Sequence, residues 1–480
     1  MKKYIIAPLF LALCIYSSTA FCVGKKTPLV AADSIAKESQ SAQASQELKA
    51  SIYVSLQNPN MQWWYNLPPN SAPHISLIKK IFVNQKFSLF TFIDKAEVKD
   101  GNFDITYCID LISQEGQRES ILEPTQFKGT KPSRDVILAC PDIMTATFSP
   151  KYALGKYTFE VTAKDNISGK TAKSSTYADF VKWIAPEPFV GDKLVKDYIS
   201  GFYLQPSPET LYSIFFSKDF NLEQKGAPNS LNYCYIGFLK TAFKNNHFLI
   251  DYIRKEFSGY EPADRAKIIF LMAICQEPKL DKSLLTKKEQ DYQERIYAAS
   301  IPDPYKGWDR VLGAAQMDML FGEFFADGTY TPIRRVIDLL AFADEGMFAE
   351  ESLEKKHKPA TAEEREKFLL GALNRTAFYS LLRRADQDPL IESYCMFAVL
   401  NNDIPQQAKK EFNPLFTETA DDKDSQKKSN EDPQIKESIK DKSQSPATVP
   451  AKVAHPTDAG QSSKKKIEIP KIVLPKIDGK

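Results

Sequence analysis

The chain has 480 residues, of which 43% are hydrophobic and 12% aromatic, so it is long enough for about two ordinary domains plus unstructured segments. Lys and Arg together number 63 and Asp and Glu 61, which gives a net charge of +2. This near-neutral balance provides no strong field for binding nucleic acid or an anionic membrane, and we expect no nucleic-acid partner.

The first 20 residues have the layout of a secretory signal peptide. Lys2 and Lys3 precede an apolar run over residues 4–16, and small residues follow as far as Ala20. The run is shorter than the roughly 20 apolar residues that span a membrane, and no later run reaches that length. We therefore predict that residues 1–20 are removed on export. The product is expected to be periplasmic or secreted, with no integral membrane span.

The seven cysteines and four histidines are scattered along the chain. Bacterial lipoprotein signals have a small residue directly before the lipidated cysteine, whereas Phe21 precedes Cys22, so a lipid anchor is not predicted. Cys108 and Cys140 lie within one predicted domain, and the sequence leaves open whether export would bridge them. No CxxC motif or metal-ligand spacing occurs, and we expect neither a metal nor another cofactor.

Residues 21–50 are mostly polar and rich in Ser, Gln and Ala, which is typical of a linker. From residue 51 to residue 185 apolar and polar side chains alternate, most clearly over residues 103–111 and 157–163. Turn sequences rich in Gly, Asn and Asp separate the alternating runs. Short strands with no helical pattern between them predict an antiparallel β-sandwich over residues 51–185.

The segment that runs from Pro150 through Gly155 and Tyr157 to Val161 resembles a corner found in immunoglobulin-like bacterial domains, with the pattern P…GxYxhxV. In those domains the glycine turns the chain and the tyrosine anchors the corner. The resemblance implies an immunoglobulin-like fold for this part of the chain and carries no information about a ligand.

After Pro186 and Pro188 the apolar residues recur with a helical period. Ser207 and Pro208 are a capping residue and a first-turn proline in the preferred order. Similar start and stop signals follow at Gly328, Thr331–Pro332 and Asp388–Pro389. The pattern predicts an all-α domain of stacked helical hairpins over residues 186–416, and hence a multidomain β + α protein.

The stretch 317–337 resembles a pattern in uncharacterised exported bacterial proteins, roughly DxLWxxFFATGDxxPVxxII, that links two helices. Phe321 stands where the pattern has Trp, and Asp327 stands where it has Thr. The resemblance implies an exported protein with an immunoglobulin-like β domain followed by a helical domain, and it implies no activity.

The densest acidic set in a semi-apolar region consists of Asp303, Asp309, Asp318, Glu323 and Asp327. If Asp318 and Glu323 converged in a groove, they could act as an acid/base pair for glycan hydrolysis. Residues five apart on a helix point about 140° apart, however, so a solvated face or a helix cap is the preferred interpretation.

The strongest aromatic cluster consists of Trp63, Trp64 and Tyr65, and we select these residues as a binding candidate. Such rings stack on sugars or on the apolar surface of a partner. The alternative is that they pack the base of the sandwich or its junction with the helical domain.

Residues 417–480 contain no aromatic residue and no cysteine, which predicts a disordered tail. The tail ends in a Lys/Pro/aliphatic segment that suits an extended peptide docking on a partner's sheet edge or groove. Its candidate binding residues are Lys464, Lys465, Lys466, Ile469, Ile472 and Leu474. A solvated, dispensable tail is the alternative.

These features together predict an exported, non-enzymatic binding or scaffolding protein of the bacterial envelope that acts through contacts with an unidentified protein partner. No catalytic residue is assigned under this hypothesis. The alternative hypothesis is an envelope or extracellular hydrolase that uses carboxylates of the helical domain. A secreted effector aimed at a host is a third hypothesis.

Overall fold

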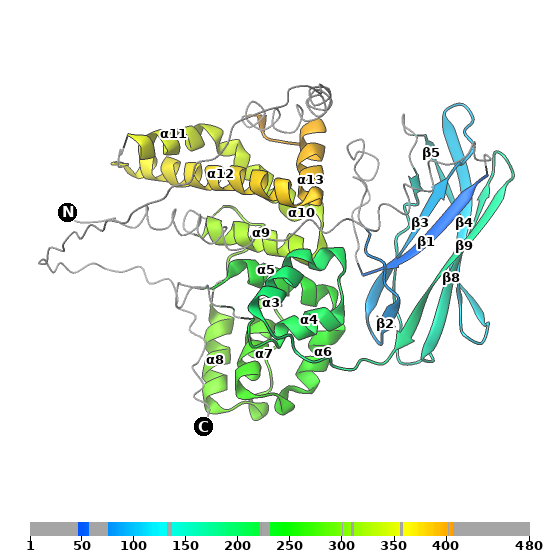
Figure 1. Cartoon of the computed structure of the whole chain (residues 1–480), viewed down its shortest axis with the longest axis horizontal. Helices are drawn as coiled ribbons and strands as arrows, with labels where there is room; N and C mark the ends of the chain where they lie inside the picture. Colours follow the sequence, from blue (N-terminus) through cyan, green and yellow to red (C-terminus); the bar gives the residue numbers. More distant parts are fainter. Residues whose placement is uncertain are drawn as a thin grey trace, which may run out of the picture.

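The computed structural model describes residues 47–56, 75–131, 137–220, 222, 231–299, 301–308, 312–355, 359–401 and 403–406. Figure 1 shows a part built of β-sheets beside a part built of helices, formed by the N-terminal and C-terminal halves of the chain. The β-then-helical order predicted from the sequence is confirmed. The predicted signal peptide, most of the linker and the tail 417–480 lie outside the described residues.

The described strands form two sheets, one with the order β1-β3-β6 and with β7 also paired to β3, the other with the order β2-β9-β8-β4-β5. Their bounds are β1 Lys49–Ser55, β2 Lys80–Phe82, β3 Lys86–Asp94, β4 Asn102–Ile112, β5 Arg118–Thr130, β6 Leu138–Ala139, β7 Met144–Thr147, β8 Gly155–Asp165 and β9 Thr171–Val181.

The alternating side chains of β4 behave as predicted: Phe103, Ile105 and Tyr107 are buried, and the residues between them are partly exposed. They share one core with residues of the other sheet such as Ile52 and Leu89. The second face of β3 is covered as well, since its remaining rings pack in a separate small cluster.

The five-stranded sheet is mixed, so the prediction of a purely antiparallel sandwich is wrong for one pair. Strand β2 runs parallel to β9, with Ile81 opposite Phe180, whereas the other ladders are antiparallel. Parallel neighbours need a long connection, and strands β3–β8 supply that length between β2 and β9. Period-two alternation does not distinguish the two strand directions, which explains why the sequence pattern missed the parallel pair.

The described helices follow from residue 192 onward. Their bounds are α3 Asp192–Gly201, α4 Pro208–Phe215, α5 Tyr233–Asn245, α6 His247–Lys255, α7 Pro262–Ile274, α8 Lys287–Ala298, α9 Gly313–Asp327, α10 Tyr330–Ile337, α11 Ala343–Glu354, α12 Ala362–Gln387 and α13 Pro389–Leu400. Short 3₁₀ segments are η2 Phe202–Leu204, η3 Phe257–Gly259, η4 Lys282–Leu284 and η5 Asp338–Phe342. Within the described ranges, none of the helices is both long and apolar enough to cross a membrane.

Most of the predicted helix signals are confirmed. The Ser207 side chain accepts a hydrogen bond from the backbone of Thr210 at the start of α4. The Asp388 side chain caps α13 in the same way, and Gly328 ends α9 with a left-handed φ of 67°. Helix α10 begins at Tyr330, before the predicted Thr331–Pro332 start.

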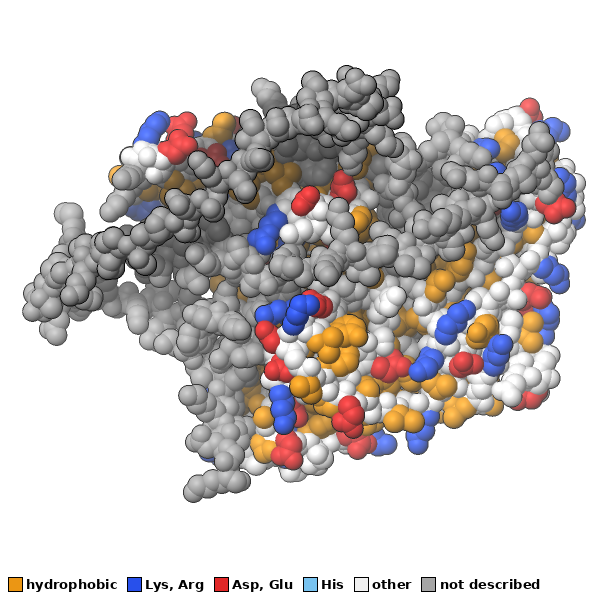
Figure 2. Space-filling model, viewed as in Figure 1, with side chains coloured by type: hydrophobic (Ala, Val, Ile, Leu, Met, Phe, Trp, Pro, Cys, Tyr) orange, Lys and Arg blue, Asp and Glu red, His pale blue; other side chains and the backbone are white. Residues whose placement is uncertain are grey.

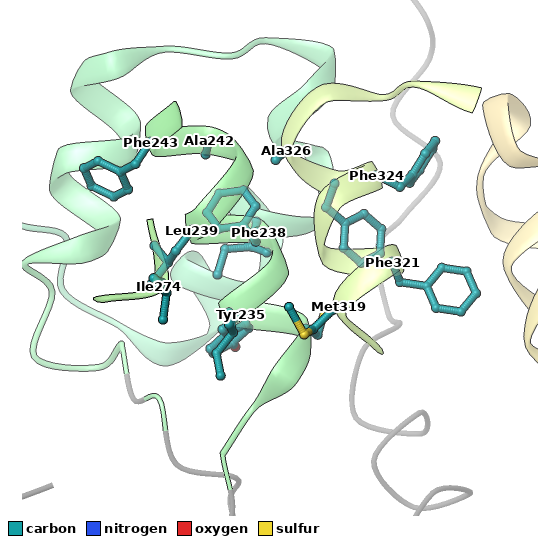
Figure 3. Packing of buried hydrophobic residues seen from close by; sticks show 14 of the residues in the cluster. Tyr235, Phe238, Leu239, Ala242, Phe243, Ile274, Met319, Phe321, Phe324 and Ala326 are labelled. Carbon is teal, nitrogen blue, oxygen red and sulfur yellow. The ribbon is translucent and has the colours of Figure 1, made fainter. Parts of the chain in front are cut away.

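Helices α5 and α9 cross with their backbones in close contact. A Cβ atom on Gly237 would lie 2.0 Å from the Met319 carbonyl oxygen, and one on Gly322 would lie 1.9 Å from the Cys234 carbonyl oxygen. The larger side chains of both helices pack around this crossing (Figure 3), among them Phe238, Leu239, Phe321 and Phe324. The crossing fixes the position of α5, which lines the site described below.

The two parts of the chain are joined through β2 and the segment that follows β9. The ring of Phe82 contacts Trp183 at 4.9 Å and Phe248 at 5.8 Å between ring centroids, and it belongs to the core of the helical part. Close by, the Ser76 hydroxyl donates to the carbonyl oxygens of Tyr203 and Leu204 at 2.9 Å.

Candidate functional site

Within the described residues, a cavity of about 450 Å³ lies between α5, α7, α8 and the segment after α8. Its size falls in the range of roughly 300–1,000 Å³ that is usual for small-molecule sites. The apolar lining includes Ile236, Ile274 and Ile296, which are at most 3% exposed. Each of these three comes from a different helix, so the cavity exists only once the helices have packed.

Lys240, Glu277 and Asp303 bring charge to the lining. The Glu277 carboxylate is already compensated, since its Oε1 lies 3.0 Å from His247 Nε2 and its Oε2 accepts from Arg254 at 3.0 Å. Unlike Glu277, the side chains of Lys240 and Asp303 form no ion pair: neither lies within ion-pair distance of an opposite charge in the described part of the chain.

One wall of the cavity continues into a segment, residues 301–308, that is fixed to α9 and α10. The Gln316 amide donates to the Asp303 carbonyl oxygen at 2.7 Å and to the Gly307 carbonyl oxygen at 3.2 Å. The Arg335 guanidinium donates to the Pro304 carbonyl oxygen at 3.2 Å and lies over the Trp308 ring. These contacts attach the wall to α9 and α10.

Tyr305 adds a further anchor to this wall. Its hydroxyl donates to Glu323 Oε2 at 2.7 Å, and Glu323 is only 8% exposed. Burial raises the pKa of Glu323 above its ordinary value, although the Tyr305 hydrogen bond opposes the shift. The predicted solvated face or helix cap is therefore wrong for Glu323, because α9 lies inside the helical core.

The other predicted carboxylates occupy separate environments. Asp318 is partly buried and has Arg384 as its nearby countercharge; burial raises the pKa of Asp318 to about 6. Asp327 accepts hydrogen bonds from the backbone and hydroxyl of Thr329, and burial likewise raises its pKa to about 6. Asp318 and Glu323 thus use different partners, while Asp309 lies outside the described residues.

The thiols of Cys108 and Cys140 are both free. Cys108 lies on the outward face of β4, whereas Cys140 belongs to the core between the sheets, where burial raises its pKa to about 12. The sheet therefore separates the two residues, and a disulfide between them would require the backbone to move. The described residues contain no group of three or more His, Cys, Asp or Glu side chains that could hold a metal.

The binding candidates chosen from the sequence lie outside the described residues, and their roles stay predictions. They are Trp63, Trp64, Tyr65, Lys464, Lys465, Lys466, Ile469, Ile472 and Leu474. Lys240 and Glu277 are not among the candidates predicted from the sequence. The sequence does mark Lys240 as unusual, because it is a lysine within the apolar run from Tyr233 to Phe243.

A second feature is an exposed apolar surface at the start of the helical part, which we call the α3 patch and define as Phe189, Val190, Leu194 and Tyr198. Val190 is 86% exposed, and Leu194 and Tyr198 are 40% and 41% exposed. The Phe189 ring stacks on Tyr198 with centroids 4.7 Å apart. Figure 2 shows hydrophobic side chains side by side among charged ones on the face that carries α3 and α4.

Comparison with known proteins assigns no family: no family model matches, and no curated protein matches. A family 123 glycoside hydrolase from Clostridium perfringens has 12% identity and a TM-score of 0.20 over 41% of this chain. Native alpha-2-macroglobulin from Escherichia coli, from domain MG7 to the C-terminus, has 10% identity and a TM-score of 0.14 over 69% of this chain. The matches span 36% and 66% of those two chains.

Proposed function

We propose that the protein is an exported binding or scaffolding protein of the bacterial envelope that acts through contacts with a protein partner. The observation that carries the proposal is the α3 patch. Contiguous apolar side chains at a protein surface mark interaction sites. Export rests on the signal-like residues 1–20 and on the resemblance of residues 317–337 to exported proteins.

The chemistry of the α3 patch suits an apolar partner surface. Covering an exposed aliphatic side chain is worth about 1.5–3 kcal/mol, and Val190 is almost fully exposed. Tyrosine is enriched among residues that dominate binding energy, and Tyr198 is braced by its stack on Phe189. The ion pairs Lys193–Asp197 and Lys196–Asp192 on the same helix supply a polar surround.

We further propose that the β part is an immunoglobulin-like sandwich. Read with the immunoglobulin strand names, β9-β8-β4-β5 corresponds to G-F-C-C′, and β1, β3 and β7 correspond to A, B and E. The Tyr157 hydroxyl donates to the Ala153 carbonyl oxygen at 2.9 Å, as in a tyrosine corner at the start of strand F. Gly155 precedes it with a φ of 147°, a conformation that favours glycine.

The hydrolase hypothesis receives no comparable support. The Glu323 carboxylate accepts from Tyr305, and the Asp327 carboxylate accepts from Thr329. Both carboxylates thus have a structural role in the fold, and burial explains the raised pKa of each.

The proposal predicts that polar substitution of the α3 patch abolishes capture of an envelope protein. The full chain and the double variant Val190→Ser/Leu194→Ser would be used as baits against the envelope fraction of the source bacterium. Leu154→Ser is the matched control, because Leu154 is 57% exposed and lies on the β part. We expect a partner that the unchanged chain and the control both retain and the double variant loses. Equal recovery with all three baits would refute a role for the patch.

A further inference from the structure

Strand β5 forms one edge of the five-stranded sheet, and among the described strands it pairs only with β4. Its register with β4 is continuous from Thr130, opposite Asn102, to Thr125. In line with this register, the Lys131 N–H donates to the Gly101 carbonyl oxygen at 2.8 Å. Opposed residues of an antiparallel pair exchange hydrogen bonds at every second position. The backbone groups of odd-numbered residues in this stretch therefore face β4, and those of even-numbered residues face away from it.

The outward-facing backbone groups belong to Gln126, Lys128 and Thr130. The other side of β4 agrees with this alternation, because the Asn166 N–H donates to the Asp104 carbonyl oxygen at 2.9 Å in line with the β4–β8 register. Even-numbered residues of β4 thus bond to β8, which leaves its odd-numbered residues for β5. A row of outward N–H and C=O groups on an edge strand is a template for one more strand.

Only the C-terminal half of β5 is suited to accept such a strand. Pro124 has no N–H, so its carbonyl oxygen is the one backbone group that it offers on this edge. On the N-terminal side of Thr125 the ladder with β4 shifts its register, as it does at β-bulges. Proline and bulges both block edge pairing, and neither occurs from Thr125 to Thr130.

We propose that this edge pairs with β5 of a second copy of the chain, antiparallel about a two-fold axis at Phe127, so that the sheet continues from one copy into the other. In this register Gln126 and Lys128 exchange backbone hydrogen bonds across the axis. The Thr130 N–H donates to the Pro124 carbonyl oxygen, so each outward N–H of the stretch finds an acceptor. This inference goes beyond the proposed function, which concerns a different protein partner at the α3 patch.

Side-chain charge favours this register over its two-fold neighbours. An axis at Lys128 would place two lysines directly opposite each other, which is unfavourable. An axis at Gln126 would extend the added strand past the proline and into the register shift. With the axis at Phe127, the exposed Glu123 of one copy comes beside the exposed Lys131 of the other, once on each side of the axis.

Phe127 provides the apolar centre of the proposed contact. Its side chain is half-buried, and its ring contacts Phe103 with centroids 4.8 Å apart. Side chains of a non-hydrogen-bonded antiparallel pair lie close together, so the two Phe127 rings would cover each other at the axis. The paired stretch is short compared with the roughly 20–30 residues that each side of a stable interface contributes. We therefore expect a dimer that dissociates on dilution.

Sedimentation velocity of the purified full chain over about a hundredfold range of concentration tests the proposal, and we expect the average mass to rise toward that of a dimer. Lys128→Pro removes an N–H that faces away from β4, so the monomer loses no hydrogen bond of the β4–β5 ladder. We expect this variant to raise the dissociation constant about tenfold or more. Lys128→Ala is the matched control: it removes the same side chain, keeps the N–H and should dimerise like the unchanged chain. Melting temperatures verify that both variants are folded.

A cysteine at the axis tests the register independently. The Cα atoms of opposed residues in a non-hydrogen-bonded pair lie about 4.5 Å apart, which is within disulfide range. Phe127→Cys should therefore form a covalent dimer on oxidation. Thr125→Cys is the control, because Thr125 lies opposite Gly129 of the second copy and its own thiols would be too far apart. The unchanged chain measures any cross-linking through natural cysteines such as Cys108.

Exchange of charge tests the pairing of Glu123 with Lys131. Glu123→Lys and Lys131→Glu should each dimerise more weakly alone, and an equimolar mixture of the two should recover the dimer, since each copy supplies the charge that the other lacks. The proposal is overturned if the chain stays monomeric at every concentration, or if Lys128→Pro dimerises as tightly as Lys128→Ala. Cross-linking of Thr125→Cys in preference to Phe127→Cys would also overturn it, because the edge would then receive a strand in another register.

Discussion

Tyrosine hydroxyls that donate to carboxylates tie distant segments of this molecule together. The described residues contain five such pairs: Tyr107–Asp142, Tyr203–Asp388, Tyr305–Glu323, Tyr330–Asp403 and Tyr379–Glu350. Each hydrogen bond gives a carboxylate a donor, which matters most where the carboxylate is buried and water cannot replace it. Among them, Tyr305–Glu323 fixes the wall of the candidate cavity.

At the residue scale, we predict that Tyr305→Phe lowers the free energy of unfolding by about 1–3 kcal/mol, because it leaves the buried Glu323 carboxylate without this donor. Tyr379→Phe is the control, since the Glu350 side chain that accepts from Tyr379 is 41% exposed, whereas Glu323 is 8% exposed. Urea unfolding followed by circular dichroism measures both variants. Equal losses in the two would contradict the structural role of the Tyr305 hydroxyl.

Among the elements, α5 and α9 make a close backbone contact that depends on particular glycines. Gly237 and Gly322 each face a backbone carbonyl of the other helix, so the two backbones approach where a side chain would separate them. Helix α11 meets α12 in the same manner at Gly371, whose Cβ would lie 1.9 Å from the Glu345 carbonyl oxygen. Glycine disfavours a helix interior by about 1 kcal/mol relative to Ala, and packing offsets that cost here.

At the element scale, we predict that Gly237→Ala destabilises the protein by about 2 kcal/mol or more, despite the better helix propensity of Ala. The added methyl group overlaps the Met319 carbonyl and forces the helices apart. Gly201→Ala in α3 is the control: its Cβ would meet nothing within 4 Å, and we expect no loss of stability. Thermal unfolding of both variants provides the measurement, and a neutral Gly237→Ala would disprove the close crossing.

Across the whole molecule, buried carboxylates make stability depend on pH. Burial raises the pKa values of Asp318 and Asp327 to about 6, and it raises those of Glu323 and Asp388 as well. A carboxyl group whose pKa is higher in the folded state favours folding while it is protonated. That contribution is fully present below the unfolded pKa of about 4 and is lost as the pH rises through the folded pKa.

At the scale of the molecule, we therefore predict that the contribution of these groups to the free energy of unfolding decreases as the pH rises from about 4 to about 7. Asp318→Asn should flatten this dependence by about 1–2 kcal/mol, because the amide does not ionise. Asp344→Asn changes an exposed carboxylate and should leave the pH dependence unaltered. Urea titrations at a series of pH values give the comparison, and identical slopes in both variants would argue against a raised Asp318 pKa.

The sequence by itself determined that a β part precedes a helical part in the described residues, together with several strands and helix ends. Alternation along β4 and the caps at Ser207 and Asp388 act within a few residues, so they can be recognised before the chain is folded. Export, the aromatic cluster and the tail segment also rest on the sequence, and the structure does not test them.

Only the tertiary structure decided which side chains meet. The cavity takes its lining from helices that begin at Tyr233, Pro262 and Lys287, and its two available charges, Lys240 and Asp303, come from separate segments. The acidic set noticed in the sequence was likewise divided among different partners, because burial and hydrogen bonding depend on neighbours distant along the chain. Local patterns carry no information about such neighbours, since packing between elements places them together.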